Sequence, residues 1–437
     1  MSNEDVGAMS EESGDKSALV PQRRFPEFRE GEAWKLEPLS SLAKRCTEKN
    51  TEGEHTRVLT NSAEFGVIDQ RDYFDKDIAN QGNLEGYYIV EKGDYVYNPR
   101  ISTSAPVGPI SKNNVGTGVM SPLYTVFRFG SSNNDFYAHY FKSTHWHHYM
   151  RQASSTGARH DRMSITNDDF MGLPLPVSVP KEQQKIADCL SSLDDLIVAE
   201  TQKLDTLKTH KKGLMQQLFP REGETVPRLR FPEFRETREW SEKPLAEVCS
   251  VLQGYGFPEV LQGRSEGKYP FCKVSDISRA VAEKGGLLDE ATNYVGDDDL
   301  LNLRAKPIPK GATVFAKIGE ALRLNRRAYV QKECLIDNNV TGLKAIDGVA
   351  DDYFVYLLSQ LIDLNRHCGG SVPSVNKSTL EEIEVVVPHL DEQKRIAESL
   401  SSLDDLITAQ SQKISALKTH KKGLMQQLFP VLDEVHG

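Results

Sequence analysis

Basic and amide side chains, the groups that hydrogen-bond to nucleic acids, gather in a few short stretches of this sequence. From Leu300 to Val330 there are seven Lys or Arg and a single acid, Glu320. From Lys142 to Arg162 there are four Lys or Arg, four His and one acid. Arginine forks and asparagine amides can read base edges, whereas lysines and backbone N–H groups hold phosphates. The stretches therefore predict nucleic-acid contacts, and the candidates are Arg100, Lys142, His145, His147, Arg151, Arg159, Arg162, Lys273, Lys317, Arg323, Asn325, Arg326, Arg327, Asn376 and Lys377.

The run RLNRRAY (323–329) is the most concentrated of these stretches, and it follows a predicted strand that ends near residues 316–318. On a strand or a tight loop, Arg323, Asn325 and Arg327 share one face, and Arg326 points the other way. We expect the shared face to approach a groove and Arg326 to meet a phosphate or an acid. The alternative is a solvated basic face that balances the acidic run GDDD (296–299).

Catalytic and metal-binding motifs are missing from the sequence. It has no GxxxxGK[ST] phosphate loop, no HExxH, no GxSxG and no glycine-rich nucleotide turn. Asn98-Pro99-Arg100 begins like the NPPY motif of amino-methyltransferases, but the second proline and the aromatic residue are absent. His145, His147 and His148 have no nearby Cys or carboxylate, which favours an ordinary helix face over a metal site. We predict no catalytic residue, no metal and no cofactor in this chain.

Length and composition describe an ordinary globular chain. With 437 residues, 38% of them hydrophobic and 27% charged, the sequence fits two or three domains. No apolar run approaches the ~18–20 residues of a membrane span, and the acidic first residues do not resemble a signal peptide. The six cysteines form no close pair, which indicates reduced thiols and a cytoplasmic protein. Because the net charge is −10, any contact with nucleic acid must use local basic faces.

Several segments of the sequence occur twice, and we call them together the frame. The two copies of the frame enclose two segments of different sequence, which we call the variable blocks. Residues 189–220 return as 399–430, with 25 of 32 positions identical. A lead segment, 20–39, returns as 226–245, and a Glu-Gln-x-x-Ile echo precedes each long repeat. The blocks between them, 40–174 and 246–384, show no obvious similarity. Since the frame is constant and the blocks are not, we expect specificity to reside in the blocks.

Each block reads as a small mixed α/β domain with short strands followed by a helix. The predicted strands lie within 86–102 and 121–129 in the first block and within 268–278 and 311–318 in the second, and the predicted helices lie at 135–152 and 351–365. The domains that follow from this division are an acidic disordered tail (1–19), globular domain 1 (20–178), helix 1 (179–222), globular domain 2 (223–386), and helix 2 with a C-terminal tail (387–437).

The long repeat carries apolar residues at a sustained four-three spacing, which predicts a coiled coil. Glu200 and Lys211 fill two seam positions in the first copy, and Gln410 and Lys421 fill them in the second. The pattern leaves two separate core helices as the alternative and does not give a direction. Pseudo-twofold symmetry of a duplicated chain favours antiparallel pairing, so we predict two globular domains separated by an antiparallel coiled coil. The predicted seam residues are Leu190, Leu193, Ile197, Leu204, Leu207, Leu214, Leu400, Leu403, Ile407, Ile414, Leu417 and Leu424.

These motifs carry a family resemblance. Glu182-Gln183, Leu193-Asp194, Glu392-Gln393 and Leu403-Asp404, with the helix LSSLDDLI…KKGLMQQLF closing each variable block, resemble the specificity subunit of type I restriction–modification systems. The resemblance covers the chain from about Arg24 to Pro430. The segment YPFCKVSDIS (269–278) is also similar to the start of a target recognition domain of that family.

The resemblance implies a non-catalytic, sequence-specific DNA-binding protein. Each variable block would read one half of a bipartite, asymmetric site on double-stranded DNA. The paired helices would set the gap and dock two methyltransferase subunits, which carry the S-adenosylmethionine chemistry. Motor-nuclease restriction subunits, using ATP with Mg, would join for cleavage. The rival is a non-enzymatic scaffold whose two domains bind proteins, and the steep salt dependence of DNA affinity separates the two.

Overall fold

The computed structural model describes residues 19–73, 84–154, 161–369 and 371–431 of the chain. All of the predicted acidic tail except Leu19 lies outside the described residues. Contacts divide the chain into two units, one formed by residues 1–198 with 416–437 and the other by residues 199–415. Each unit therefore holds one variable block and part of each repeated helix.

The first variable block folds around a four-stranded antiparallel sheet with the strand order β2-β9-β6-β7. The central strand β6 is buried on both faces of the sheet. Successive side chains of a strand point to opposite faces, so its residues enter two different apolar clusters. Tyr95 and Tyr97 pack into one apolar cluster and Val96 into another. The strands of this sheet are β2 (Ala43–Arg45), β9 (Thr125–Phe129), β6 (Tyr95–Tyr97) and β7 (Ile110–Lys112).

Two short strand pairs and several helices complete this domain. The strand pairs are β3 (Leu59–Ser62) with β4 (Gly66–Asp69) and β5 (Tyr88–Val90) with β8 (Gly118–Met120). The helices are η1 (Pro26–Phe28), α1 (Leu39–Leu42), α2 (Gln70–Tyr73), α3 (Asp135–Tyr140), α4 (His147–Ala153) and α5 (Asn167–Met171).

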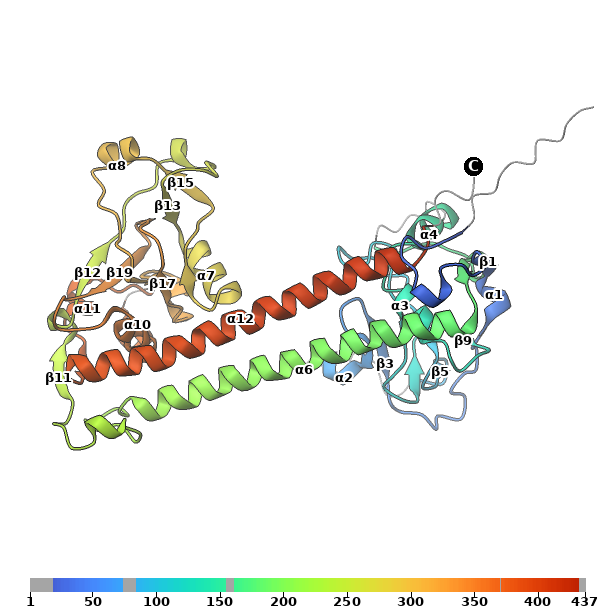
Figure 1. The fold of residues 1–437 in the computed structure, drawn as a ribbon, viewed down its shortest axis with the longest axis horizontal. Helices are drawn as coiled ribbons and strands as arrows, with labels where there is room; N and C mark the ends of the chain where they lie inside the picture. The colour runs from blue at the N-terminus through green and yellow to red at the C-terminus, as the bar shows by residue number, and fades with distance from the viewer. Residues whose placement is uncertain (1–18, 74–83, 155–160, 370, 432–437) are drawn as a thin grey trace, which may run out of the picture. The chain divides into compact units, whose positions relative to one another are not determined.

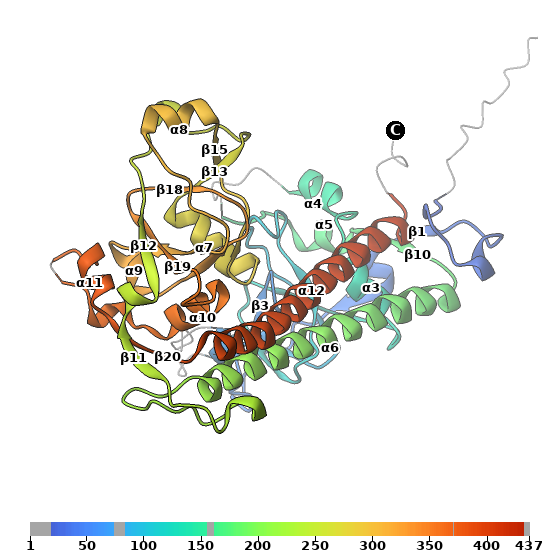
Figure 2. The ribbon, with the colours of Figure 1, turned by 60° about the vertical axis from the view of Figure 1, so that its left-hand side comes forward.

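The second block is built on a five-stranded sheet, β12-β19-β16-β17-β14, and a smaller sheet, β15-β13-β18. Strands β12 and β19 lie side by side (Figure 2), and every residue of β12 has a partner in β19. The strands are β12 (Cys249–Gln253), β19 (Val340–Ala345), β16 (Thr313–Ala316), β17 (Ala328–Val330), β14 (Leu287–Leu288), β15 (Asn293–Val295), β13 (Tyr269–Cys272) and β18 (Leu335–Ile336). The helices are η2 (Pro232–Phe234), η3 (Leu245–Glu247), α7 (Val274–Glu283), η4 (Glu259–Leu261), α8 (Asp297–Leu303), α9 (Glu320–Arg323), α10 (Asp352–Leu361), η5 (Leu364–Arg366) and α11 (Lys377–Glu381).

The two blocks share one fold despite their dissimilar sequences. The order β2-β9-β6-β7 in the first corresponds to β12-β19-β16-β17 in the second, and every neighbouring pair in both series is antiparallel. An antiparallel strand pair also closes each block, β1 (Lys35–Pro38) with β10 (Pro174–Val177) and β11 (Ser241–Pro244) with β20 (Glu384–Val387). A sheet requires the alternation of apolar residues more than their identity, so the fold persists while the sequence changes.

Each long repeat forms one continuous helix of 39 residues, α6 (Pro180–Leu218) and α12 (Leu390–Leu428). At ~1.5 Å per residue, each helix is about 58 Å long. Pro220 and Pro430 follow the two helices, as expected for a residue that cannot continue a helix. The predicted segments 179–222 and 387–437 thus contain α6 and α12.

Within each unit the two helices lie side by side and run in opposite directions (Figure 1). In the second unit Glu200 faces Gln410, and Lys211, further along α6, faces Asp404, which comes earlier in α12. The predicted seam side chains are all buried or half-buried. The predicted fold class, mixed α/β domains on an antiparallel, pseudo-twofold helix pair, is confirmed.

Candidate nucleic-acid interface

In the first globular domain, the loop after β6 pairs with a distant segment that leads into α5. Arg100 forms an antiparallel bridge with Arg162, and the Met163 N–H donates to the Pro99 carbonyl at 2.8 Å. Residues directly opposite each other in an antiparallel pair place their side chains on the same face. Arg100 is exposed, and the Nε of Arg162 is buried without a hydrogen-bond partner among the described residues. The structure therefore brings these two predicted residues together.

The second domain places a loop at the equivalent position, after β16. Ile318 bridges Ser374, and the Val375 N–H donates to the carbonyl of Lys317 at 2.9 Å. Asn376 then caps α11 by accepting from the Thr379 N–H at 2.8 Å. The predicted residues Lys317, Asn376 and Lys377 thus come from two segments that meet, at the place where the first domain presents Arg100 and Arg162.

Polar side chains that are distant in sequence surround Lys317 and Lys273. The Nζ of Lys317 donates to Gln253 Oε1 at 3.4 Å, and the Nζ of Lys273 donates to Gln262 Oε1 at 2.9 Å. Lys273 also lies over the ring of Phe257, 4.8 Å from its centroid. Glutamine amides and lysine ammonium groups can bond base edges and phosphates, and an aromatic ring can stack on a base.

Gln253, Gln262 and Phe257 were missed by the sequence analysis. A usable signal was the pair of glycines in Gly254-Tyr255-Gly256, the turn that follows β12. A Cβ on Gly254 would lie 1.8 Å from the carbonyl oxygen of Asp337, so only glycine fits there. This close approach fixes the turn that carries Gln253 against the strand end at Asp337.

The prediction that Arg323, Asn325 and Arg327 share one exposed face is wrong. Asn325 and Arg327 contact each other, but Arg327 is buried and Arg323 lies on a helix. Arg323 ends the short helix α9 and pairs with Glu320 at 3.6 Å. Asn325 has a φ of 51° and donates from its amide to the Ile362 carbonyl at 3.1 Å. The loop that this left-handed residue forms turns the next side chains back toward the domain.

Arg327 is a structural residue and not an exposed reader of bases. It is only 4% exposed, lies over the ring of Phe315 at 4.4 Å, and donates to Asn325 Oδ1 at 3.0 Å. Burial lowers the pKa of Arg327 to about 10. Asp297 and Asp299, proposed as the alternative partners of the run, instead pair with Lys268 and Arg264. Arg326 is half-buried, and its role as a phosphate contact stays a prediction.

The basic residues around α3 and α4 lie against the helical frame. Lys142 is 3.6 Å from Asp194 of α6, and the ring of His145 is 6.3 Å from that of Phe429. Burial lowers the pKa of His147 to about 4. Arg151 is exposed on α4, and Arg159 lies outside the described residues. For Lys142 and His145 the surroundings thus favour attachment of the domain over a role in reading DNA.

The Glu of each Glu-Gln motif holds the lead segment. Arg24 donates to both oxygens of Glu182, at 2.6 and 2.8 Å, and the indole of Trp34 donates to the same carboxylate at 3.1 Å. Arg230 makes the equivalent pair with Glu392, at 2.8 and 2.7 Å. Both carboxylates are almost fully buried. The repeated Arg and Glu are therefore the two halves of one clamp, used once in each unit.

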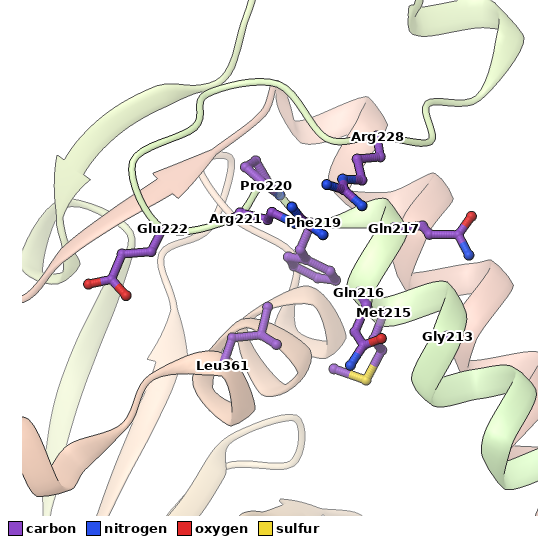
Figure 3. Close-up of a pocket in the computed structure, with 10 residues that line it drawn as sticks. All are labelled: Gly213, Met215, Gln216, Gln217, Phe219, Pro220, Arg221, Glu222, Arg228 and Leu361. Carbon is purple, nitrogen blue, oxygen red and sulfur yellow. The ribbon is translucent and has the colours of Figure 1, made fainter.

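A hollow of about 740 Å³ lies at the C-terminal end of α6 (Figure 3). The last turn of α6, the chain after Phe219 and Leu361 of α10 line it, with the side chains of Arg221 and Arg228 close to Phe219. Most of these residues belong to the constant frame, so we do not assign the hollow to the variable reading surface. The residues that the structure describes contain no group of three or more His, Cys, Asp or Glu able to hold a metal ion. No described helix is long and apolar enough to cross a membrane.

Comparison with known families decides the classification. The family described as "Type I restriction modification DNA specificity domain" matches residues 69–209 and 237–419, more than half of the chain. The chain belongs to this family. The two matched regions correspond to the two units of the duplication, each with its globular domain and a long helix.

Individual relatives are distant. The type I restriction enzyme MjaVIII specificity subunit of Methanocaldococcus jannaschii is 25% identical over 298 residues, 64% of this chain and 65% of that protein. The chain spans less than two thirds of the length of the curated relatives it matches. The crystal structure of the type I restriction–modification S subunit from M. genitalium aligns with 94% of this chain and 99% of its own, at a TM-score of 0.57 and 15% identity. A chain from a structure describing complex assembly of the type I R-M system aligns with 91% of this chain and 97% of its own, at a TM-score of 0.54 and 15% identity.

Proposed function

We propose that this chain is the DNA-reading specificity subunit of a type I restriction–modification complex. Each globular domain reads one half of a split, asymmetric site on double-stranded DNA. The observation that carries the proposal is that two domains with one strand order present different side chains at the same loops. Arg100 and Arg162 occupy the loops of the first domain, and Lys317 and Asn376 occupy those of the second. One fold with exchanged loop residues is what two different half-sites require.

The frame supports docking of two copies of one partner, for which we propose methyltransferase subunits. Identity between the repeats extends to exposed positions, which helix packing does not constrain. Leu196 is 40% exposed and its repeat equivalent Leu406 is 55% exposed. The basic run Lys208-Thr209-His210 is exposed and returns as an exposed run at 418–420. Two identical surfaces on one chain suit two identical partners.

In this proposal the partner subunits carry out DNA methylation and cleavage. We propose that this chain is non-catalytic and acts in the cytoplasm. The methyltransferase subunits bring S-adenosylmethionine, and motor-nuclease restriction subunits bring ATP with Mg. The specificity chain contributes the choice of DNA sequence and holds no cofactor of its own.

A genome-wide map of DNA methylation, made with and without this chain, tests the proposal. We expect methylation at one split, asymmetric motif to disappear when the chain is removed and to return when it is restored. An unchanged map would overturn the proposal. The rival function, a scaffold that binds proteins, is tested by titrating the protein with DNA at two salt concentrations. A DNA-binding protein should lose affinity steeply as salt rises, because its basic side chains neutralise phosphates.

A further inference from the structure

Asp404 of α12 is contacted from two other elements of the second unit. Lys211 of α6 donates to both of its carboxylate oxygens, at 2.7 and 2.6 Å, and the hydroxyl of Tyr353 donates to the same carboxylate. Tyr353 belongs to α10, which packs on the sheet of the globular domain. Burial and the Asp404 charge raise the pKa of Tyr353, so its hydroxyl stays a donor. The carboxylate thus joins α12, α6 and α10.

Asp194 of α6, the repeat equivalent of Asp404, makes the matching junction in the first unit. Lys421 of α12 pairs with it, as Lys211 pairs with Asp404. The globular domain supplies Lys142, whose Nζ lies 3.6 Å from the Asp194 carboxylate. His139 bonds from its Nε2 to Ser191 Oγ at 3.0 Å, whereas its Nδ1, 4.0 Å from the carboxylate, makes no hydrogen bond among the described residues. His139 lies within α3 and Lys142 just after it. The second domain therefore reaches the repeated aspartate from α10. The first reaches it from Lys142, directly after α3, while His139 of α3 bonds to Ser191, about one helical turn before Asp194.

A second repeated side chain holds the beginning of the same helices. Gln393 accepts from the Asp351 N–H at 3.1 Å and donates to the Val349 carbonyl at 3.2 Å, directly before α10. Gln183 donates to the hydroxyl of Tyr137 in α3 at 3.3 Å. The frame thus grips each of these helices at two points, a glutamine and an aspartate about three helical turns further along.

We propose that Asp194 and Asp404 are sockets that fix a mounting helix, α3 or α10, of each globular domain on the frame. The acceptor is constant, whereas the domain's partner differs: a phenol in the second domain and an ammonium in the first. A carboxylate can pair with either group, so one frame can carry domains of unrelated sequence. Any domain carried by this frame must place a donor at this position. The inference does not depend on what the domains bind.

A simpler role for the two aspartates is helix register alone, since Lys211 and Lys421 already pair with them across the seam. Register does not require Tyr353, however, and Tyr353 spans from the globular domain to the frame. Two variants distinguish the two roles. Tyr353→Phe removes only the hydrogen bond from the globular domain to Asp404, and Lys211→Met removes only the ion pair between α6 and α12. Tyr269→Phe is a matched control, because Tyr269 donates to Asp297 at 3.1 Å within the globular domain.

Amide hydrogen exchange on the intact chain tests the proposal. In Tyr353→Phe we expect the amides of α10 to exchange about tenfold faster than in the wild type, because the variant loses a hydrogen bond to a charged group. The amides of β16 and β19 should keep their wild-type rates. In Lys211→Met the faster exchange should appear first in the facing halves of α6 and α12. Tyr269→Phe should leave α10 unchanged.

Two results would overturn the socket. One is an α10 exchange rate in Tyr353→Phe no faster than in Tyr269→Phe. The other is a uniform rise over the whole second domain, which would mean that Tyr353 supports the domain core and does not attach it to the frame.

Discussion

Arg323 and Arg327 are neighbours in one basic run, yet their surroundings call for different experiments. Arg327→Ala should lower the free energy of unfolding of the second unit by about 2–4 kcal/mol, because it removes buried hydrogen bonds and the contact with Phe315. Arg327→Met should cost less, since it keeps apolar volume and removes a buried charge. Arg323→Ala should change stability by less than about 0.5 kcal/mol. Urea unfolding measures all three, and equal losses for the two alanine variants would contradict the assignment.

His139 makes the stability of the first unit depend on pH. Burial lowers its pKa to about 4, compared with ~6.5 in an unfolded chain. As pH falls from about 6.5 to 4, the unfolded chain binds a proton that the folded chain does not, so stability is lost in this window. One such group contributes a slope of at most ~1.4 kcal/mol per pH unit. Urea unfolding between pH 4 and 7 should show a flatter slope for His139→Gln than for wild type.

The control for this experiment is His148→Gln, which replaces an exposed histidine on α4. It should keep the wild-type slope. Equal slopes for the wild type and His139→Gln would show that His139 is not the titrating group.

Residue type predicted part of the candidate site, and tertiary contacts decided the rest. Arg100, Arg162 and Lys317 were identified from charge alone, but their placement depends on bridges between distant segments, Arg100 with Arg162 in the first domain and Ile318 with Ser374 in the second. The burial of Arg327 could not be predicted, because it depends on packing against Phe315 of another strand. Gln253 was missed because an isolated amide has no spacing pattern; only its turn glycines mark the place.

At the scale of elements, the two long helices were predictable and the strand order of the sheets was not. The predicted helix 135–152 is wrong as one helix, because α3 ends at Tyr140 and α4 begins at His147. The seam spacing of α6 and α12 follows directly from 3.6 residues per turn, and the duplication supplied the antiparallel direction. The shared strand order of the two blocks was hidden, because a sheet constrains the alternation of apolar residues and leaves their identity free. The run 323–329 was misread as a strand or loop face because α9 is a helix of four residues, too short to leave a periodic pattern.

Because α6 and α12 are antiparallel, an insertion that lengthens the pair must be made in both helices at facing positions, near Glu200 and Gln410. Four residues inserted after Gln202 in α6 and after Gln412 in α12 add ~6 Å and ~40° of rotation to both helices. One base pair of DNA adds ~3.4 Å and ~35°. If the helices set the gap between half-sites, the methylated motif should gain one or two base pairs in its gap and keep both half-sequences.

The control is the insertion in α6 alone, which moves Lys211 out of register with Asp404 and should lower the unfolding midpoint. A stable double-insertion protein whose motif keeps the original gap would show that the helices do not set the spacing.

At the scale of the whole molecule, each unit contains one globular domain and part of each long helix. The clamps of Arg24 with Glu182 and of Arg230 with Glu392 repeat in the two units, as do the seam pairs. Within each unit, everything that repeats in sequence lies in the lead or the helices, and what differs lies in the globular domain. We propose that the molecule is organised as two exchangeable readers on one constant frame.

Replacement of residues 40–174 by the corresponding block of another family member tests this claim most directly. The methylated motif should be mapped for the parent and for the chimaera in the same cells. The account predicts that one half of the split motif changes to that of the donor, while the other half and the gap stay as they were. A change in both halves, or in neither, would contradict two independent readers on a shared frame.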